Sequence, residues 1–202
     1  MKIVAHLFVA FFVISLLAAC GGGNDDYIPK PRTYPRVIYP EKAYKTFDES
    51  PCGFTFQQPA YTEVIKDLKF FGETPKNPCW FDLYYPQFDA KLHCNYVQID
   101  NKDNPLIKLV DDSYKLASKH ASRASSIGEE AVYFPNKNVY GVIFPLEGSV
   151  ASPYQFFVTD SVNHFLRGSL YFNTSPNPDS MAPVIDFIRA DIDSIITSFE
   201  WE

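Results

Sequence analysis

The sequence has few of the residues and spacings on which metal and hydrolase chemistry is usually built. Its 202 residues include four histidines and four cysteines, with no CxxC pair, no HExxH run and no EF-hand loop to hold a metal ion. A Gly-x-Ser-x-Gly elbow and a glycine-rich phosphate loop are also missing. We therefore expect no catalytic residues, no metal site and no bound cofactor.

Histidine and cysteine are adjacent only at His93-Cys94, on a predicted strand. Neighbouring side chains of a strand point to opposite faces of the sheet, so these two should not ligate one ion together. His120 lies on a predicted helix and His164 opens a predicted strand. A structural role is the expectation for each of these histidines.

Positive charge is also scarce. Lysine and arginine number 18 against 24 aspartates and glutamates, which gives a formal net charge of −6. A weakly acidic chain is poorly suited to phosphate backbones or anionic headgroups. No basic patch with interleaved aromatic residues changes this balance, and nucleic acid is not expected as a partner.

Long apolar runs are absent except at the start. The run from Ile3 to Ala19 follows a single charge, Lys2, and is short for a membrane-spanning helix. A basic start, an apolar run and small residues before a cut site are typical of a secretory signal peptide. We predict that residues 1–19 are such a peptide.

The end of this leader, Leu17-Ala18-Ala19-Cys20, has the form of the lipobox of bacterial lipoproteins. In a lipobox the cysteine thiol takes a diacylglyceryl group, the chain is cut before the cysteine, and the new amino group is acylated. The alternative is an ordinary signal peptide with a chance cysteine, and the glycines at 21–23 argue against it. Cys20 is thus the predicted lipidation site.

Several acyl chains would hold the protein firmly at a membrane. Each buried CH₂ contributes about 0.8 kcal/mol, so that one chain binds marginally and two or three form a lasting anchor. The covalent lipid on Cys20 is the only non-protein group that we expect. The protein should therefore lie in the cell envelope, outside the cytoplasm.

Three cysteines remain after lipidation, enough for one disulfide and one free thiol in an oxidising compartment. Cys52 and Cys79 each follow a proline at the start of a predicted strand, whereas Cys94 lies within one. We favour a Cys52–Cys79 bond, which would stabilise the fold by about 3 kcal/mol. Pairs of Cys94 with either of the others stay open, and non-reducing peptide mapping distinguishes the three.

A tether and an arm separate the lipid from the domain. Residues 20–26, with three glycines, predict a flexible tether. Residues 27–48 are rich in proline, which forbids helix and favours an extended chain. Lys30, Arg32 and Arg36 make this arm the most basic stretch of the chain. It can lie along the domain, dock an envelope partner, or do both.

Residues 49–202 read as a single globular domain rich in aromatic residues. Short alternating or aromatic runs bounded by turn residues predict strands at 53–57, 80–85, 91–99, 131–134, 139–144, 154–158 and 164–172. A helix is predicted from a cap at Asn104 toward Gly128, with a stripe of apolar and small residues that includes Ala121 and Ala124. The order predicts an α+β fold, a mostly antiparallel sheet of about six or seven strands packed by two helices.

The second helix is predicted to follow the capping cluster Asn177-Pro178-Asp179-Ser180. Its buried face should consist of Val184, Ile185, Ile188, Ile192, Ile195, Ile196 and Phe199. The charged residues Asp186, Arg189, Asp191, Asp193 and Glu200 should lie largely away from that face.

Several of these segments together resemble the gliding-motility lipoprotein GldD family of Bacteroidota. The matching residues in the arm are Tyr27, Pro29, Lys30, Pro31, Arg32, Tyr34, Arg36, Pro40-Glu41-Lys42 and Tyr44. Those in the domain are Cys52, Cys79-Trp80-Phe81-Asp82, Leu92-His93, Tyr96 and the end from Asp191 to Trp201. The order of strands and helices also resembles PsbP-like domains, which are binding and assembly modules, a likeness of fold alone.

The resemblance to this family implies a lipoprotein needed for gliding and type IX secretion, with no catalytic residues. Its partners would be other envelope proteins of that machinery, contacted through Pro29, Lys30, Pro31, Arg32, Tyr34 and Arg36. Gly21 after the cysteine gives no reason for retention at the inner membrane, so we favour the periplasmic face of the outer membrane.

Two other functions compete with this one. The abundant aromatic residues would also fit a periplasmic ligand-binding lipoprotein for a hydrophobic or aromatic ligand, which needs an open apolar cavity. A hydrolase of unfamiliar design would need titratable groups that converge in a deep pocket.

Overall fold

The computed structural model describes residues 36–47, 53–66, 79–175 and 177–202. All of them belong to one unit that extends from residue 35 to residue 202. The description below concerns this unit.

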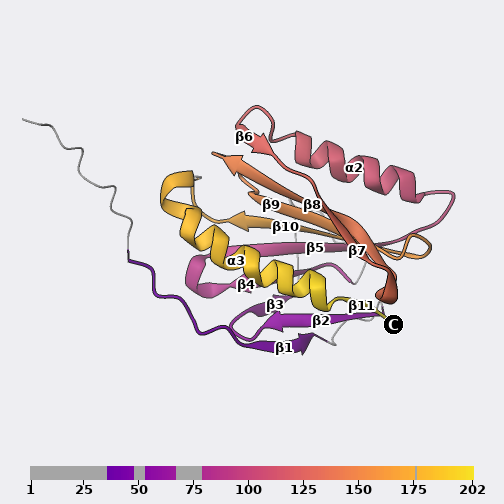
Figure 1. The fold of residues 1–202 in the computed structure, drawn as a ribbon, viewed down its shortest axis with the longest axis horizontal. Coiled ribbons are helices and arrows are strands. Elements are labelled where there is room, and N and C mark those ends of the chain that lie inside the picture. Colours follow the sequence, from indigo (N-terminus) through magenta and orange to yellow (C-terminus); the bar gives the residue numbers. More distant parts are fainter. Residues whose placement is uncertain (1–35, 48–52, 67–78, 176) are drawn as a thin grey trace, which may run out of the picture. The chain divides into compact units, whose positions relative to one another are not determined.

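Eight antiparallel strands form the main sheet, in the order β3-β4-β5-β10-β9-β8-β6, with β7 also paired to β8 (Figure 1). Their bounds are β3 Glu63–Ile65, β4 Phe81–Tyr85, β5 Ala90–Gln98, β6 Ala124–Ile127, β7 Glu130–Phe134, β8 Val139–Gly148, β9 Tyr154–Thr159 and β10 His164–Phe172. Tight turns connect β7 to β8 and β9 to β10. The first is a 3₁₀ turn at Pro135–Lys137, and in the second Asp160 accepts backbone N–H bonds from residues 162–164.

A second sheet has three antiparallel strands in the order β1-β2-β11. These strands are β1 Tyr44–Phe47, β2 Phe54–Pro59 and β11 Glu200–Trp201. The chain thus returns at its C-terminal end to the strand with which the domain begins, and Phe47 of β1 is part of the core.

The α+β prediction is confirmed, with antiparallel sheets and two helices among the described residues. The seven predicted strands correspond to β2, β4, β5, β7, β8, β9 and β10. Four strands were not predicted: β1, β3, β6 and β11 are only two to four residues long. Segments this short show too little alternation of apolar and polar residues to be recognised as strands. They form strands because neighbouring strands pair with them.

Helix α2 extends from Leu106 to Ser118 and ends before Gly128, as predicted, but the predicted cap is wrong and Ala121 and Ala124 lie beyond the helix. Asn104 does not cap it, because its side-chain amide donates to Asp100 Oδ2 at 3.2 Å instead. The helix ends well before Gly128, since Ala124 already belongs to β6, which pairs with β8. The small residues at 124–126 fit a helix or a strand, and the backbone bonds to β8 decide between the two.

Helix α3 extends from Pro178 to Ser198, as predicted. Asn177 caps it by accepting a hydrogen bond from the Ser180 amide at 3.3 Å. Most of the predicted face is buried, namely Ile188, Ile192, Ile195, Ile196 and Phe199. Asp191 was predicted to lie away from this face, and that is wrong, because it is fully buried.

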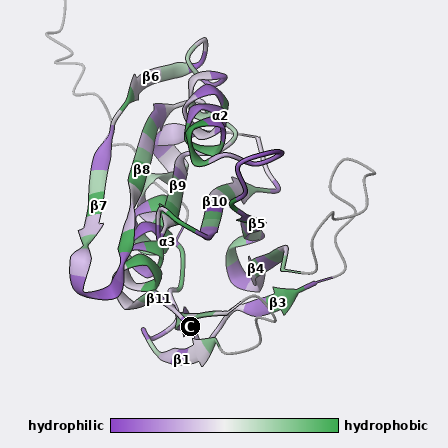
Figure 2. Ribbon diagram, turned by 90° about the vertical axis from the view of Figure 1, so that its right-hand side faces the viewer, coloured by the Kyte–Doolittle hydropathy of each residue, from purple (hydrophilic) through white to green (hydrophobic). Residues whose placement is uncertain are grey.

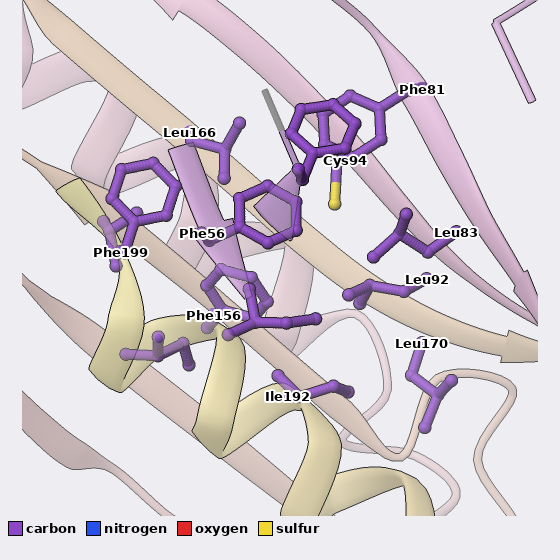
Figure 3. Packing of buried hydrophobic residues seen from close by; sticks show 14 of the residues in the cluster. Phe56, Phe81, Leu83, Leu92, Cys94, Phe156, Leu166, Leu170, Ile192 and Phe199 are labelled. Atoms are coloured by element: carbon purple, nitrogen blue, oxygen red, sulfur yellow. The ribbon is translucent and has the colours of Figure 1, made fainter. Parts of the chain in front are cut away.

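The two helices cover opposite faces of the main sheet, as the two buried clusters show. Alternate residues of β4, β5, β9 and β10 pack with α3 and the small sheet in an aromatic-rich core, which Figure 3 shows around Phe56, Phe156 and Ile192. On the other face, Phe144, Phe157 and Phe165 pack with α2 in a smaller cluster. Both helices carry hydrophobic and hydrophilic residues, as Figure 2 shows, which suits helices that lie on a sheet.

Candidate functional site

Most of the predicted site residues lie outside the described residues: Cys20, Pro29, Lys30, Pro31, Arg32, Tyr34 and Cys52. Arg36 is described and exposed. Lipidation at Cys20 and the docking role of the arm therefore stay predictions, and the structure describes the part of the arm that begins at Arg36.

The cysteines of the domain differ in state. Cys79 is disulfide-bonded, and Cys94 is a free, buried thiol in the core. Burial raises the pKa of the Cys94 thiol well above its usual range, which keeps it protonated and unreactive. The predicted Cys52–Cys79 pairing stays a prediction, because Cys52 lies outside the described residues.

The arm lies against helix α3 and the turn before β5. Tyr39 packs against the rings of Phe187 and Phe88, with centroids 4.9 and 5.9 Å away. Gln87 donates a hydrogen bond to the Ile38 carbonyl. Ile38 itself is 72% exposed, so the arm here presents one apolar side chain to solvent while another covers the domain.

Lys42 fastens the arm to α3. Its ammonium group is 2.6 Å from Asp191 Oδ1 and donates to the Phe187 carbonyl at 2.8 Å. It also lies 3.5 Å from the centroid of the Phe187 ring, close enough for a cation–π contact. A single lysine thus meets a carboxylate, a carbonyl and an aromatic face, all from α3.

Asp191 is the centre of this contact. Its side chain is fully buried and accepts hydrogen bonds from Tyr44 at 3.1 Å and from Tyr61 at 2.7 Å, besides the bond from Lys42. A buried carboxylate needs a positive partner and several donors to offset the loss of water. We call Lys42, Tyr44, Tyr61 and Asp191 the arm clamp.

The two tyrosines of the arm clamp donate to Asp191 in their neutral form. Burial is the main cause that raises the pKa of Tyr61, and its hydrogen bond to Asp191 raises it further. Burial also raises the pKa of Tyr44, although a hydrogen bond from Ser194 opposes this effect. Both hydroxyls therefore keep their protons at neutral pH and remain donors.

Sequence reasoning missed Asp191, although a signal was present. Ile188, Asp191 and Ile195 are spaced by three and four residues, the spacing of one helix face. An aspartate within an apolar stripe indicates a buried charge that requires a partner. The complementary lysine and tyrosines lie about 130 to 150 residues earlier in the chain, and no local pattern connects them to the helix.

A row of polar side chains crosses the other face of the main sheet. Asp82, His93, Ser169 and Gln155 are successive cross-strand neighbours on β4, β5, β10 and β9. We call them the polar row. All four are buried, and Asp82 Oδ1 lies 2.7 Å from His93 Nδ1.

The polar row has the residue types of a serine hydrolase triad but lacks its geometry. A triad needs a serine hydroxyl bonded to the histidine and open to substrate. Ser169 is fully buried, and its hydroxyl has no hydrogen-bond partner. The arrangement therefore does not support the hydrolase hypothesis.

The remaining histidines and acids form no metal site among the described residues. His93 and Cys94 point to opposite faces of β5, as predicted, with Cys94 in the core and His93 in the polar row. His164 Nδ1 lies 2.6 Å from the Tyr96 hydroxyl, and its ring packs against Trp201. These contacts are structural.

The core formed by the described residues leaves little room for an apolar ligand. The space between the main sheet, the small sheet and α3 is filled by side chains, including closely packed rings such as Phe47 and Phe56 with centroids 4.6 Å apart. A small recess, open to solvent, lies at the rim near the start of α3, where Val150, Phe172 and Met181 line it. A filled core counts against the ligand-binding alternative.

Within the described part of the chain, no helix is both long and apolar enough to cross a membrane. A search of curated proteins found no match. Among solved structures, cyanobacterial PsbP (CyanoP) from Synechocystis is similar, with 15% identity and a TM-score of 0.48 over 86% of this chain and 99% of that chain. At that level the likeness adds nothing to what the strands and helices establish.

The family comparison covers both the arm and the domain. The model of the gliding motility lipoprotein GldD matches residues 24–201, a range that includes the arm, every strand and both helices described above. The arm clamp, the polar row and the C-terminal strand all fall inside it. The chain therefore belongs to the gliding motility lipoprotein GldD family.

Proposed function

We propose that this lipoprotein is a non-enzymatic assembly or stabilising subunit of the gliding and type IX secretion apparatus. In this proposal it acts through protein–protein contacts, and its partners are other envelope proteins of that machinery. The family supplies the coarse part, a lipid-anchored envelope protein of gliding motility. The role in secretion, the contacts and the mechanism are the parts we add.

The arm clamp is the observation that supports this proposal most. Lys42 and Tyr44 hold the described end of the arm on α3 through a fully buried carboxylate. The basic residues Lys30, Arg32 and Arg36 precede this anchor by at most 12 positions. A short, proline-rich segment next to a fixed point has fewer conformations to lose on binding than a free tail, which favours a docking role.

The lipid and the arm have separate tasks in this proposal. The acyl chains on Cys20 keep the protein at the periplasmic face of the outer membrane, where partners are concentrated. The basic strip, Pro29 to Arg36, then contacts an acidic surface of a partner. Charged contacts of this kind contribute to specificity and association rate more than to affinity.

The test is an in-frame deletion in the native organism, complemented with wild type, with Cys20→Ala, or with the triple change of Lys30, Arg32 and Arg36 to Ala. We expect the deletion to abolish colony spreading and type IX cargo, and the triple variant to restore little of either. A matched control replaces three exposed lysines of the domain, Lys102, Lys108 and Lys119, with Ala. This control should restore both phenotypes.

The outcomes separate the parts of the proposal. Normal spreading of the triple variant would reject the docking role, and full rescue by Cys20→Ala would show that the lipid is dispensable. A deletion that changes neither spreading nor secretion would remove the assembly role itself. Immunoblots of each strain must show wild-type protein levels, because an unstable variant would mimic a lost contact.

A further inference from the structure

Arg167 is a largely buried cation without an acidic partner. It lies on β10, between Phe165 and Ser169 on the face that carries α2 and the polar row. None of the ion pairs among the described residues includes it. Its one hydrogen bond goes from Nη2 to Gln155 Oε1 at 2.5 Å. The side chain is intermediate in exposure, and its partner is a neutral amide rather than a carboxylate.

The groups beside Arg167 are also unpaired donors. Gln155 uses its carbonyl oxygen for Arg167, and its Nε2 is buried without a partner. The Ser169 hydroxyl, directly across from Gln155, is buried without a partner as well. Both residues are at most 1% exposed. A buried donor with no acceptor is costly, about 1–3 kcal/mol each.

His120, in the turn after α2, is a further titratable group near Arg167. It is half-buried, and besides burial the charge of Arg167 lowers its pKa. Asn95, the cross-strand neighbour of Arg167, adds a buried side-chain oxygen that also lacks a partner.

Apart from the Asn95 oxygen, the unpaired groups beside Arg167 are donors, and donors next to a positive charge are complementary to an oxyanion. A guanidinium group offers parallel N–H bonds that fit a carboxylate or a phosphate. An amide N–H₂ and a hydroxyl at neighbouring positions would satisfy the remaining oxygen lone pairs. Gln155 and Ser169 are held by adjacent strands, so their positions relative to Arg167 are set by the sheet.

We propose that Arg167, Gln155 and Ser169 form a binding site for the carboxylate or phosphate group of a small molecule. The site lies on the face of the main sheet opposite α3, next to His120. It is separate from the arm clamp and does not depend on the docking role of the arm. The side chains of Gln155 and Ser169 are buried, whereas Arg167 is intermediate in exposure, so a ligand from solvent meets Arg167 first.

Thermal unfolding of the full chain, purified in detergent from its native host, tests this site. Sodium succinate and sodium phosphate are titrated separately, against sodium chloride at equal ionic strength. We expect one of the two anions to raise the Tm saturably, by about 5 °C at roughly 100 times its Kd. Which anion does so identifies the ligand as a carboxylate or a phosphate.

Two variants make the result specific. Arg167→Met should abolish the saturable rise. Arg189→Met, which changes an arginine of α3 that lies over the Tyr154 ring on the opposite face of the sheet, should keep it. Gln155→Glu places a carboxylate against the guanidinium group and should raise the Tm without added anion and remove the response. This variant keeps the test valid if Arg167→Met does not fold.

The proposal fails if neither anion gives a saturable rise beyond that of chloride in the wild type. It also fails if Arg167→Met, or Gln155→Glu where the methionine variant does not fold, responds as the wild type does. In either case, the unpaired donors would be a packing defect of the sheet that the rest of the core outweighs.

Discussion

The two faces of the main sheet differ in the kind of side chain that they bury. The face under α3 and the small sheet carries a large cluster of rings, and Phe54 alone packs with five other aromatic side chains of the core, Phe47, Phe56, Phe81, Tyr96 and Phe199. The opposite face has a smaller apolar cluster under α2 and, beside it, the polar row. Among the described residues, six buried side-chain atoms lack a hydrogen-bond partner, and three of them belong to Asn95, Gln155 and Ser169 on that second face.

This difference separates stability from potential function. Burial of apolar side chains stabilises the fold in proportion to the area removed from water and needs no specific partner. The α3 face can therefore stabilise the fold by packing alone. Buried polar groups need specific partners, and where those are missing the fold loses stability. The α2 face therefore carries the groups that a ligand could satisfy, whereas helix α3 on the other face carries Asp191 of the arm clamp.

The largest effect should come from a hole in the aromatic face. Phe56→Ala removes a ring that is 2% exposed and packs against Phe47, Phe81 and Phe199. We expect a loss of about 4–5 kcal/mol in the free energy of unfolding, at the upper end for such changes. Urea unfolding followed by tryptophan fluorescence measures it.

The matching change on the other face is Phe157→Ala, which removes a ring that is 4% exposed in the smaller cluster. Its loss should be nearer 3 kcal/mol, because α2 lies on that face as a separate element that can close part of the cavity. Ile107→Ala, at a side chain 76% exposed, serves as control and should have almost no effect. Equal losses for the two phenylalanines would mean that the faces contribute alike.

The arm clamp gives the next largest effect. Asp191→Ala leaves the ammonium group of Lys42 and two tyrosine hydroxyls without their acceptor. Removing one partner of a buried pair costs about 3–5 kcal/mol, and because Lys42 is one-third exposed we expect about 3 kcal/mol. The arm should also become sensitive to protease near Lys42, which mass spectrometry of the fragments would show.

A control on the same helix is Asp186→Ala, whose side chain is 72% exposed and 3.9 Å from Arg189. Surface pairs of this kind contribute about 0–1 kcal/mol, so this variant should unfold like the wild type. If Asp191→Ala unfolds like it too, the arm clamp does not hold the arm.

The contrast between the faces also explains what could be predicted from the sequence. The isoleucines of α3 and the strand hairpins follow local periodicity, and reasoning from spacing found them. Local spacing also places Asp191 in the stripe, yet its donors are Lys42 and Tyr44 of the arm and Tyr61 after β2, far away in the chain. The stripe predicted for α2 extended too far, to Ala124, for the same reason, since the pairing of Ala124 with β8 is not visible locally.

The alignment of the polar row could not be predicted from the sequence. Asp82, His93, Ser169 and Gln155 lie on four strands, and their alignment depends on the register of three strand pairs. A shift of one residue in any pair would send one member to the other face. Short motifs report chemistry only when the residues are close in sequence, and these four span 88 positions.

The smallest effect, and the one most specific to the arm clamp, comes from Tyr61→Phe. The change removes a 2.7 Å hydrogen bond to Asp191 and should cost about 1.5 kcal/mol at pH 7. The pKa of Tyr61 is raised in the fold, mainly by burial, so the unfolded chain loses this proton first, near pH 10. Its contribution is therefore complete below about pH 10 and is lost as the pH rises further.

The variant should lose less stability than the wild type between pH 9 and pH 11, in urea unfolding at each pH. Some decline remains, because burial also raises the pKa of Tyr85 and Tyr154. Tyr133→Phe, at a side chain 69% exposed, is the control and should follow the wild-type curve at every pH. A Tyr61→Phe curve parallel to the wild type would mean that the tyrosine ionises alike in both states, and the tight contact with Asp191 would then be absent in solution.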